Sequence, residues 1–249
     1  MPAYREAGRI ATTVDRIRNE LGPLVGVDDL EIVVVDDGSR DGTAEAARAA
    51  GAHQVVVQPV NQGKGAAVRA GVKAATGRTV AFTDADLAYS PSQVHRLLVQ
   101  VEAGWDVVVG SRYHHDTTTV VPVRRVREVG GRLVNVATRI VLVGNHADTQ
   151  CGMKAFRSDV ARVLFSHGKV DGFAFDVELY LLTELYGFSL VEVPVEVENS
   201  ERSTVNVVRD AVRLITDLGR IRRSARAGVY DLDPGELDGL APGPADTGE

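Results

Sequence analysis

The sequence lacks the residues and runs that several protein classes need. Cys151 is the single cysteine among 249 residues, which excludes an internal disulfide and a cysteine-rich zinc site. No apolar run reaches the ~20 residues of a membrane-spanning helix. The longest one, which begins at Leu133, is interrupted by Asn135 and Arg139. The first residues show no signal-peptide pattern. We therefore expect a cytoplasmic protein without a transmembrane segment, which at most contacts the cytoplasmic face of a membrane peripherally.

Aromatic residues are few, and the chain has no excess of basic charge. Aromatics make up 5% of the chain, and the formal net charge is −6. Residues 230–249 hold six acids and no base, so the remainder has 28 bases against 34 − 6 = 28 acids. A neutral body with few aromatics lacks the basic, stacking surface that nucleic-acid binding requires. We exclude nucleic acid as a partner.

The length and the 44% hydrophobic content suit one globular α/β domain. We expect this domain to cover residues 1–228 and to end in a basic amphipathic helix at about 205–227. Residues 229–249 are rich in Pro, Gly and Asp, which predicts a disordered tail.

Short β-branched runs alternate with helical stretches along the first half of the chain. Strands are predicted at 31–37, 53–58, 79–84 and 106–110, and helices at 42–50, 64–75 and 91–103. Near-continuous apolar strands of this kind indicate a mixed, mostly parallel sheet sandwiched by helices. The opening segment MPAYREAGRI shows a loop and a helix entry with no strand before them. We expect the opening strand of the sheet to be missing, through a truncated or miscalled start.

Acidic residues follow two of these strands. Asp36 and Asp37 end one strand, while Asp84 and Asp86 follow the run TVAFT. Ligands of open α/β sheets bind beyond the carboxyl ends of the strands. Two carboxylates on a short loop suit Mg²⁺ or Mn²⁺, which often bind one or two carboxylates plus substrate phosphates. The alternative interpretation is a solvated turn in which Asp86 caps the following helix.

Other phosphate-binding patterns do not fit. A P-loop needs Ser or Thr after its Gly-Lys pair, but Gly65 follows Lys64. The dinucleotide pattern GxGxxG fails because Val68 occupies the last position. A DxDx[TV] phosphatase motif fails at Ala88. A metal-bound diphosphate at Asp84 and Asp86 is the interpretation that remains.

Four segments together resemble the family 2 glycosyltransferases of the GT-A fold, over about residues 1–112. They are PAYREAGRI, IVVVDDGSRDGT, NQGKGAAVRAG and AFTDADL. Further segments extend the resemblance to about residue 205: GSRY, ADTQCGMKAF, FAFDVELY and VEVPVEV. These are similar to the branch that transfers a sugar to a polyprenyl phosphate, with the dolichyl-phosphate glucosyltransferases closest and the mannosyl enzymes next.

The resemblance assigns donor-binding roles to residues at the strand ends. It implies that the loop that cradles the base and ribose contains Pro2, Ala3, Tyr4 and Glu6. Asp37 matches an acid that contacts the base or ribose. Asp84 and Asp86 match the metal-binding pair, with Asp86 the direct ligand. Lys64 lies in the segment that faces the nucleotide, although a surface lysine at a helix start explains it equally well.

The resemblance also places residues near the acceptor. Arg112 and Arg124 or Arg125 match positions close to the acceptor phosphate, and the Arg202–Ser203 pair resembles a later element of the same site. Arginine suits phosphate because its planar fork donates two hydrogen bonds. Each of these arginines could instead lie on a solvated face.

Two further acids are candidates for orienting the acceptor or the sugar. Asp148 lies in the DTQCG turn, whereas Asp176 could equally serve as a helix cap or an ion-pair partner. We expect Asp86, Arg112 and Asp148 to carry catalysis.

The reaction implied is a metal-dependent, inverting transfer of a hexose to a polyprenyl or dolichyl phosphate. UDP-glucose is the favoured donor and GDP-mannose the second. A phosphomonoester has a second pKa near ~6 and so needs little help from a general base at neutral pH. Two alternatives stay open: a family 2 transferase with a soluble or cell-wall acceptor, and a catalytically weak nucleotide-sugar-binding protein.

The last helical pattern has an apolar stripe and a basic surface. The stripe consists of Val205, Val208, Val212, Ile215 and Leu218, at three- and four-residue spacing. Such a helix can lie on an anionic membrane, or it can pack on the sheet with its arginines in water. Both interpretations stay open.

Overall fold

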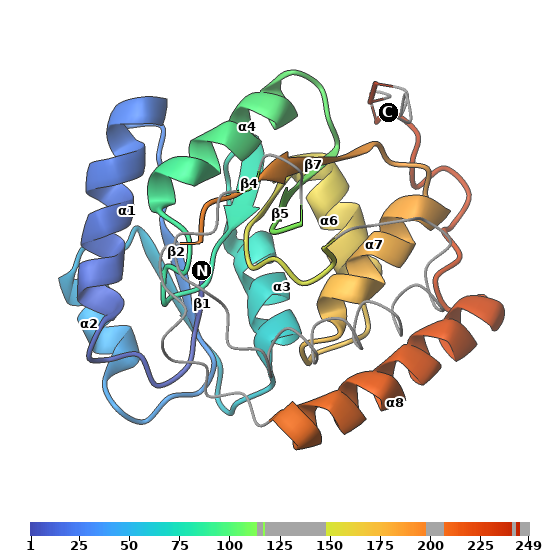
Figure 1. The fold of residues 1–249 in the computed structure, drawn as a ribbon, viewed down its shortest axis with the longest axis horizontal. Coiled ribbons are helices and arrows are strands. Elements are labelled where there is room, and N and C mark those ends of the chain that lie inside the picture. The colour runs from blue at the N-terminus through green and yellow to red at the C-terminus, as the bar shows by residue number, and fades with distance from the viewer. Residues whose placement is uncertain (114–116, 118–147, 198–206, 241–242, 245–249) are drawn as a thin grey trace.

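The computed structural model describes residues 1–113, 117, 148–197, 207–240 and 243–244. Two sheets form its centre, with helices on both sides (Figure 1). The first sheet has the order β1-β2-β3 and the second β4-β6-β5-β7. The strands are β1 (Pro2–Ala3), β2 (Val33–Asp36), β3 (Gln54–Val57), β4 (Thr79–Phe82), β5 (Val107–Ser111), β6 (Lys154–Arg157) and β7 (Leu190–Pro194).

The strand pairing is mixed, as the sequence predicts. β1, β2 and β3 run parallel, and β5 pairs with β7 in parallel. β6 is antiparallel to both β4 and β5. All four strands predicted from the sequence form: three lie within the expected ranges, and β5 extends one residue past its range, to Ser111.

The helices cover both faces of the sheets. They are α1 (Ile10–Val25), α2 (Thr43–Ala49), α3 (Lys64–Ala74), the short 3-10 helix η1 (Pro91–Gln93), α4 (Val94–Glu102), α6 (Ser158–His167), α7 (Phe175–Leu185) and α8 (Val207–Arg226). α1 shows why they pack: its buried residues Ile10, Val14, Ile17 and Leu21 recur every three or four positions and face the core. Within the described parts of the chain, no helix is long and apolar enough to cross a membrane.

The start of the chain corrects one expectation. Pro2 and Ala3 form a short strand, β1, rather than a loop, and they pair with Val35 and Asp36 of β2. The backbone nitrogen of Met1 donates to the Val33 carbonyl at 2.8 Å and extends this contact by one residue. Proline tolerates this position because it begins the strand, where its missing N–H is not needed. The sheet therefore has a two-residue opening strand where the sequence suggested none.

The C-terminal segment differs from the expected pattern at two residues, Ile215 and Tyr230. Among the α8 side chains that the structure describes, the buried apolar ones are Leu214, Leu218 and Ile221. Leu218 of the predicted stripe is thus buried as expected, whereas Ile215 is 63% exposed. Val205 and the side chains of Val208 and Val212 lie outside what the structure describes.

Tyr230, expected in the disordered tail, is buried and donates to Glu178 at 2.7 Å. Burial of a large aromatic ring whose hydroxyl has a hydrogen-bond partner stabilises the folded state. Tyr230 is therefore ordered although the Pro- and Gly-rich composition around it predicts disorder. We propose that the domain boundary lies beyond Tyr230.

Candidate active site

The acidic pair lies in a tight turn immediately after β4. Ala85 and Leu87 are buried and anchor this turn, whereas Asp84 is half-buried and Asp86 is exposed. The backbone nitrogen of Leu87 donates to the Asp84 carbonyl at 3.1 Å, and Leu87 has a left-handed φ of 47°. The Thr13 hydroxyl fixes the turn from α1 by donating to the Ala85 carbonyl at 2.8 Å. The two carboxylates therefore stand on a stiff support.

Lys64, the first residue of α3, reaches one of these carboxylates. Its Nζ atom lies 2.7 Å from Oδ1 of Asp84. Burial opposes the lysine charge, but the neighbouring Asp84 and Asp176 carboxylates outweigh burial and raise the pKa of Lys64. Lys64 thus stays charged beside the acidic pair.

The electrostatics of the acidic pair suit a divalent cation. Burial, and then the charge of Asp84, raise the pKa of Asp86. Burial also raises the pKa of Glu6, with Asp86 among the charges that add to this shift. In the described part of the chain, no cluster of three or more His, Cys, Asp or Glu residues could hold a metal. Two carboxylates fit Mg²⁺ or Mn²⁺ if substrate phosphates supply further oxygen ligands. Asp84 and Asp86 would hold such an ion.

Asp37 organises the neighbouring loop rather than facing solvent. One carboxylate oxygen accepts from the Gln62 nitrogen at 2.7 Å, and the other accepts from the Gly63 nitrogen and from Asn61, both at 2.9 Å. Burial raises the pKa of Asp37, although the two backbone hydrogen bonds oppose the shift. Gly63, at φ 109°, lies against the Asp171 backbone, where an added Cβ would come within 2.5 Å of the carbonyl oxygen. The 61–63 loop that precedes Lys64 is therefore fixed by the Asp37 carboxylate on one side and by the Asp171 backbone on the other.

The segment expected to hold the base and ribose follows β1 directly. Tyr4 is 42% exposed, and the Arg5 guanidinium lies 5.2 Å from the centre of its ring. The backbone nitrogen of Glu6 donates to the Thr43 hydroxyl at 2.9 Å. This contact ties the segment to the start of α2. Tyr4 thus presents an accessible ring face beside the ends of β1 and β2.

Arg112 and Asp148 form a closely fitted pair at the end of β5. The Arg112 side chain donates through Nε to Oδ2 of Asp148 at 2.6 Å and through Nη2 to Oδ1 at 2.8 Å. Its backbone nitrogen donates to Oδ2 at 3.0 Å. Burial alone would raise the pKa of Asp148, but the hydrogen bonds and charge of Arg112 lower it. Asp148 is therefore a fixed anion that orients Arg112, whose own side chain is 39% exposed.

The turn at residues 148–152 links this pair to the acidic pair. Asp148 stands at one end of the turn and Gly152 at the other. A Cβ added to Gly152 would overlap Oδ2 of Asp84. Glycine is therefore required for the Asp84 carboxylate to lie where it does. The turn brings the two predicted groups of residues into one site.

Lys154, which was not predicted as a site residue, contacts this turn from the protein interior. Its Nζ atom donates to the Cys151 carbonyl at 2.7 Å and to Oδ1 of Asp176 at 2.6 Å, and the side chain is 1% exposed. Asp176, for which a helix cap or an ion pair seemed equally suitable, is the ion-pair partner. The sequence pattern that could have identified Lys154 is a lysine inside the apolar run MKAF, because a buried lysine requires an ion-pair or hydrogen-bond partner.

Four predicted acceptor residues lie outside the described residues. They are Arg124, Arg125, Arg202 and Ser203. The described site thus contains the expected donor residues together with Arg112, Asp148 and Asp176.

Comparisons with known sequences point to one group of proteins. The model of the family described as "Glycosyl transferase family 2" matches residues 1–165. The dolichyl-phosphate beta-glucosyltransferase of Trichomonas vaginalis is 30% identical over 246 residues, which cover 93% of this chain and 74% of that protein. A protein of the same name from Drosophila melanogaster is 33% identical over 210 residues, covering 78% of this chain and 64% of that protein.

A solved structure is similar in fold. Glucosyl-3-phosphoglycerate synthase from Mycobacterium tuberculosis, in complex with Mn²⁺ and UDP-glucose, has a TM-score of 0.63 and 25% sequence identity. The likeness covers 94% of this chain and 79% of that one. The GT-A fold expected from the sequence is confirmed.

Proposed function

Because the chain belongs to the family 2 glycosyltransferases, we propose that it transfers a hexose from a nucleotide sugar to a polyprenyl phosphate. UDP-glucose is the favoured donor and GDP-mannose the second. The structural observation that carries this proposal is the 148–152 turn, which joins a metal-suited acidic pair to a positioned, partly exposed arginine. The names of the relatives support the choice of a dolichyl phosphate or similar acceptor.

Donor binding is assigned to the residues after β1, β2 and β4. Tyr4 offers a ring face for the base, and Asp37 acts by holding the 61–63 loop. Lys64 and a Mg²⁺ or Mn²⁺ ion held by Asp84 and Asp86 would face the diphosphate. When bound, the metal supplies positive charge that stabilises the departing nucleotide diphosphate.

Acceptor binding is assigned to Arg112. Its guanidinium is held by Asp148 on one side, and the exposed remainder can donate to a phosphate oxygen. An acceptor phosphate oxygen forms a bond to the anomeric carbon while the bond from that carbon to the diphosphate oxygen breaks. The configuration at this carbon inverts. The phosphomonoester is ionised at neutral pH, so Asp148, with its lowered pKa, need not act as a base.

Peripheral membrane contact at the cytoplasmic face is part of the proposal. α8 exposes Ile215 together with Arg220, Arg223 and Arg226. Exposed arginines beside an apolar side chain suit an anionic lipid surface. Flotation with anionic vesicles should carry the protein upward, and neutral vesicles should carry less. If the same fraction of the protein stays unbound with anionic and with neutral vesicles, the proposed membrane contact is contradicted.

The direct test is transfer from radiolabelled UDP-glucose or GDP-mannose to polyprenyl phosphate, with Mg²⁺, with Mn²⁺ and with EDTA. We expect a lipid-extractable product from UDP-glucose that EDTA abolishes. Asp86→Asn should lose the product, whereas Asp28→Asn, which changes an exposed acid far from the site, should retain it. Nucleotide binding without product from either donor would favour a binding role.

A soluble acceptor is the second candidate function. The observation that favours it is the fold likeness to glucosyl-3-phosphoglycerate synthase at 25% identity. Including 3-phosphoglycerate as acceptor in the same assay separates the two. Label that stays in the aqueous phase as a new glucoside would select the soluble acceptor.

A further inference from the structure

A chain of buried hydrogen bonds leads from the segment after α8 to the start of α3. It begins at Tyr230, which is 2% exposed and donates through its hydroxyl to Oε1 of Glu178 at 2.7 Å. Glu178 lies in α7 and is also 2% exposed. Burial, and then the hydrogen bond to Glu178, raise the pKa of Tyr230, so that its hydroxyl stays protonated and acts as the donor. This contact ties the C-terminal segment to α7.

The Glu178 carboxylate in turn holds the loop at residues 168–172, which joins α6 to α7. Its Oε1 atom accepts from the backbone nitrogen of Lys169 at 2.8 Å, and Oε2 accepts from that of Val170 at 2.9 Å. On the other side of the loop, Arg69 of α3 donates to Oδ1 of Asp171 at 2.8 Å and to the Val170 carbonyl at 3.1 Å. The 168–172 loop is therefore fixed between α7 and α3.

The 168–172 loop caps the first turn of α3. The Asp171 carbonyl accepts from the backbone nitrogens of Gly65 at 2.7 Å and of Ala66 at 3.3 Å. Such first-turn N–H groups have no acceptor within their own helix. The contact is close, because a Cβ added to Gly65 would come within 2.5 Å of the Val170 carbonyl oxygen. The position of the loop therefore sets the position of Lys64, the first residue of α3.

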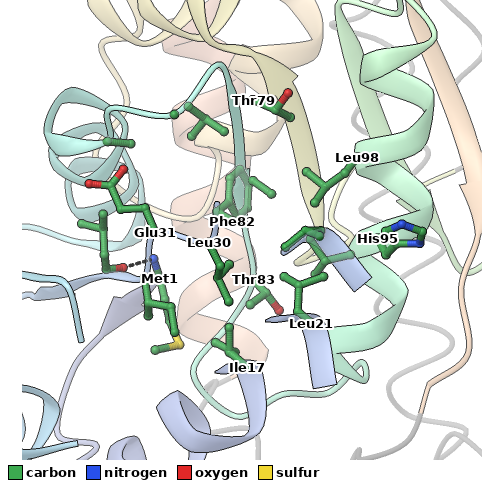
Figure 2. Close-up of a pocket in the computed structure, with 18 of the residues that line it drawn as sticks. Met1, Ile17, Leu21, Leu30, Glu31, Thr79, Phe82, Thr83, His95 and Leu98 are labelled. Atoms are coloured by element: carbon green, nitrogen blue, oxygen red, sulfur yellow. Dashed lines mark hydrogen bonds between the residues drawn. The ribbon is translucent and has the colours of Figure 1, made fainter. Parts of the chain in front are cut away.

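The residue that follows this loop into α7 contacts the Lys64 side chain as well. The centre of the Phe175 ring lies 6.0 Å from Nζ of Lys64, a distance that suits a cation–π contact. The same ring lies 5.9 Å from the ring of Phe82 in β4, which Figure 2 labels. On the other side of the ammonium group, Oδ1 of Asp84 lies 2.7 Å away. The segment that Glu178 holds thus contacts both the backbone and the charged end of the α3 start.

We propose that Glu178 and Tyr230 are positioning residues, which hold the 168–172 loop against α3 and so keep Lys64 where it meets the donor diphosphate. The inference rests on the proposed function, in which Lys64 faces that diphosphate. Both residues act through the backbone of the loop rather than by touching the substrate. Without the Tyr230 hydroxyl, the Glu178 carboxylate keeps its two backbone donors but loses its link to the C-terminal segment. The loop and the first turn of α3 then open more often.

The test compares two variants of the full chain that each lose one hydroxyl. Tyr230→Phe keeps the buried ring but removes the hydrogen bond to Glu178. We expect amide hydrogen exchange at Gly65 and Ala66 to quicken about fivefold or more, and the Kd for UDP with Mn²⁺ to rise about threefold or more. Tyr186→Phe is the matched control, because the Tyr186 hydroxyl donates at 2.9 Å to the Tyr230 carbonyl and anchors the same segment without touching Glu178.

The control variant should change both quantities by less than about twofold, because the link from Tyr230 to Glu178 stays intact in it. Equal effects of the two variants, or unchanged exchange at Gly65 and Ala66 in Tyr230→Phe, overturn the proposal. In the transfer assay, the donor KM of Tyr230→Phe should rise with the Kd while the acceptor KM stays unchanged. A lower kcat with an unchanged donor KM would indicate a merely structural role and contradict the proposal.

A double-variant cycle tests whether Tyr230 acts through Lys64. Lys64→Ala should weaken UDP binding, and adding Tyr230→Phe should weaken it no further, because residues that act through one another have non-additive effects. Additive losses would show that Tyr230 acts elsewhere and overturn the proposal. A wild type that binds neither UDP nor GDP contradicts the proposed function. A wild type that binds UDP with the same Kd as Tyr230→Phe contradicts this inference alone.

Discussion

At the scale of single residues, Gly152 has the sharpest steric requirement in the site. A methyl group there would overlap the Asp84 carboxylate, which is the flexible end of a side chain and can move aside. Gly152→Ala should therefore leave the fold intact but displace one of the two proposed metal ligands. We expect the Mn²⁺ concentration for half-maximal transfer to rise about tenfold or more.

The matched control for this variant is Gly219→Ala, where an added Cβ meets nothing within 4 Å. Thermal melting should give similar Tm values for both variants. An unchanged metal requirement in Gly152→Ala would show that Asp84 does not need this position.

The buried pair of Lys154 and Asp176 should be costly to break on one side. Lys154→Met leaves the Asp176 charge without its 2.6 Å partner in a site where both side chains are almost fully buried. We expect the free energy of unfolding, measured in urea, to fall by about 3–5 kcal/mol. Replacing both residues, as Lys154→Met with Asp176→Leu, should cost less than the single change. A single-variant loss below about 1 kcal/mol would contradict the ion pair.

Asp148 should contribute to stability in a pH-dependent way. Its folded-state pKa is lowered, because Arg112 outweighs the effect of burial. The contribution is therefore fully present above the unfolded-state pKa of about 3.9 and is lost as the pH falls through the lower folded-state value. The difference in unfolding free energy between wild type and Asp148→Asn should be constant from pH 7 to 5 and shrink below about pH 4. A difference that grows on acidification would have the wrong sign.

At the scale of elements, α8 separates a packing face from a solvent face. Ile221 is completely buried, whereas Ile215 in the same helix is 63% exposed. Ile221→Ala should lower the free energy of unfolding by about 2–5 kcal/mol, and Ile215→Ala should change it by no more than about 0.5 kcal/mol. Urea denaturation of the two variants checks this assignment. Equal effects would mean that the helix packs in another orientation.

The sequence predicted an element correctly where a single pattern of apolar residues ran through it. The β-branched runs after Glu31 and Arg78 formed β2 and β4, because strands covered by helices on both faces have near-continuous apolar sequences. In the stripe predicted for α8, Leu218 is buried as expected, but Leu214 is buried in place of Ile215. Both of these residues are apolar, and only contacts with the rest of the domain decide which one is covered. β1 was missed because two residues carry no periodicity.

At the scale of the whole molecule, the order of strands explains which site residues could be foreseen. Acids at strand ends are visible in a sequence, so Asp84, Asp86 and Asp37 were predicted to lie at one edge of the sheet. The engagement of Asp37 by the 61–63 loop and the support of the 148–152 turn by Lys154 depend on contacts between distant segments. No local pattern records such contacts.

The central claim is that the acidic pair and the Asp148-held Arg112 join a nucleotide sugar to a polyprenyl phosphate. The most direct measurement is the initial rate of lipid-extractable transfer for wild type and Arg112→Lys, with each substrate varied in turn. Lysine keeps the charge beside Asp148 but lacks the planar fork. The account predicts that the acceptor KM rises on the order of tenfold, since one charge-assisted hydrogen bond is worth about 1.5 kcal/mol, while the donor KM stays unchanged. A change in the donor KM alone, or no lipid-extractable product from the wild type, would contradict it.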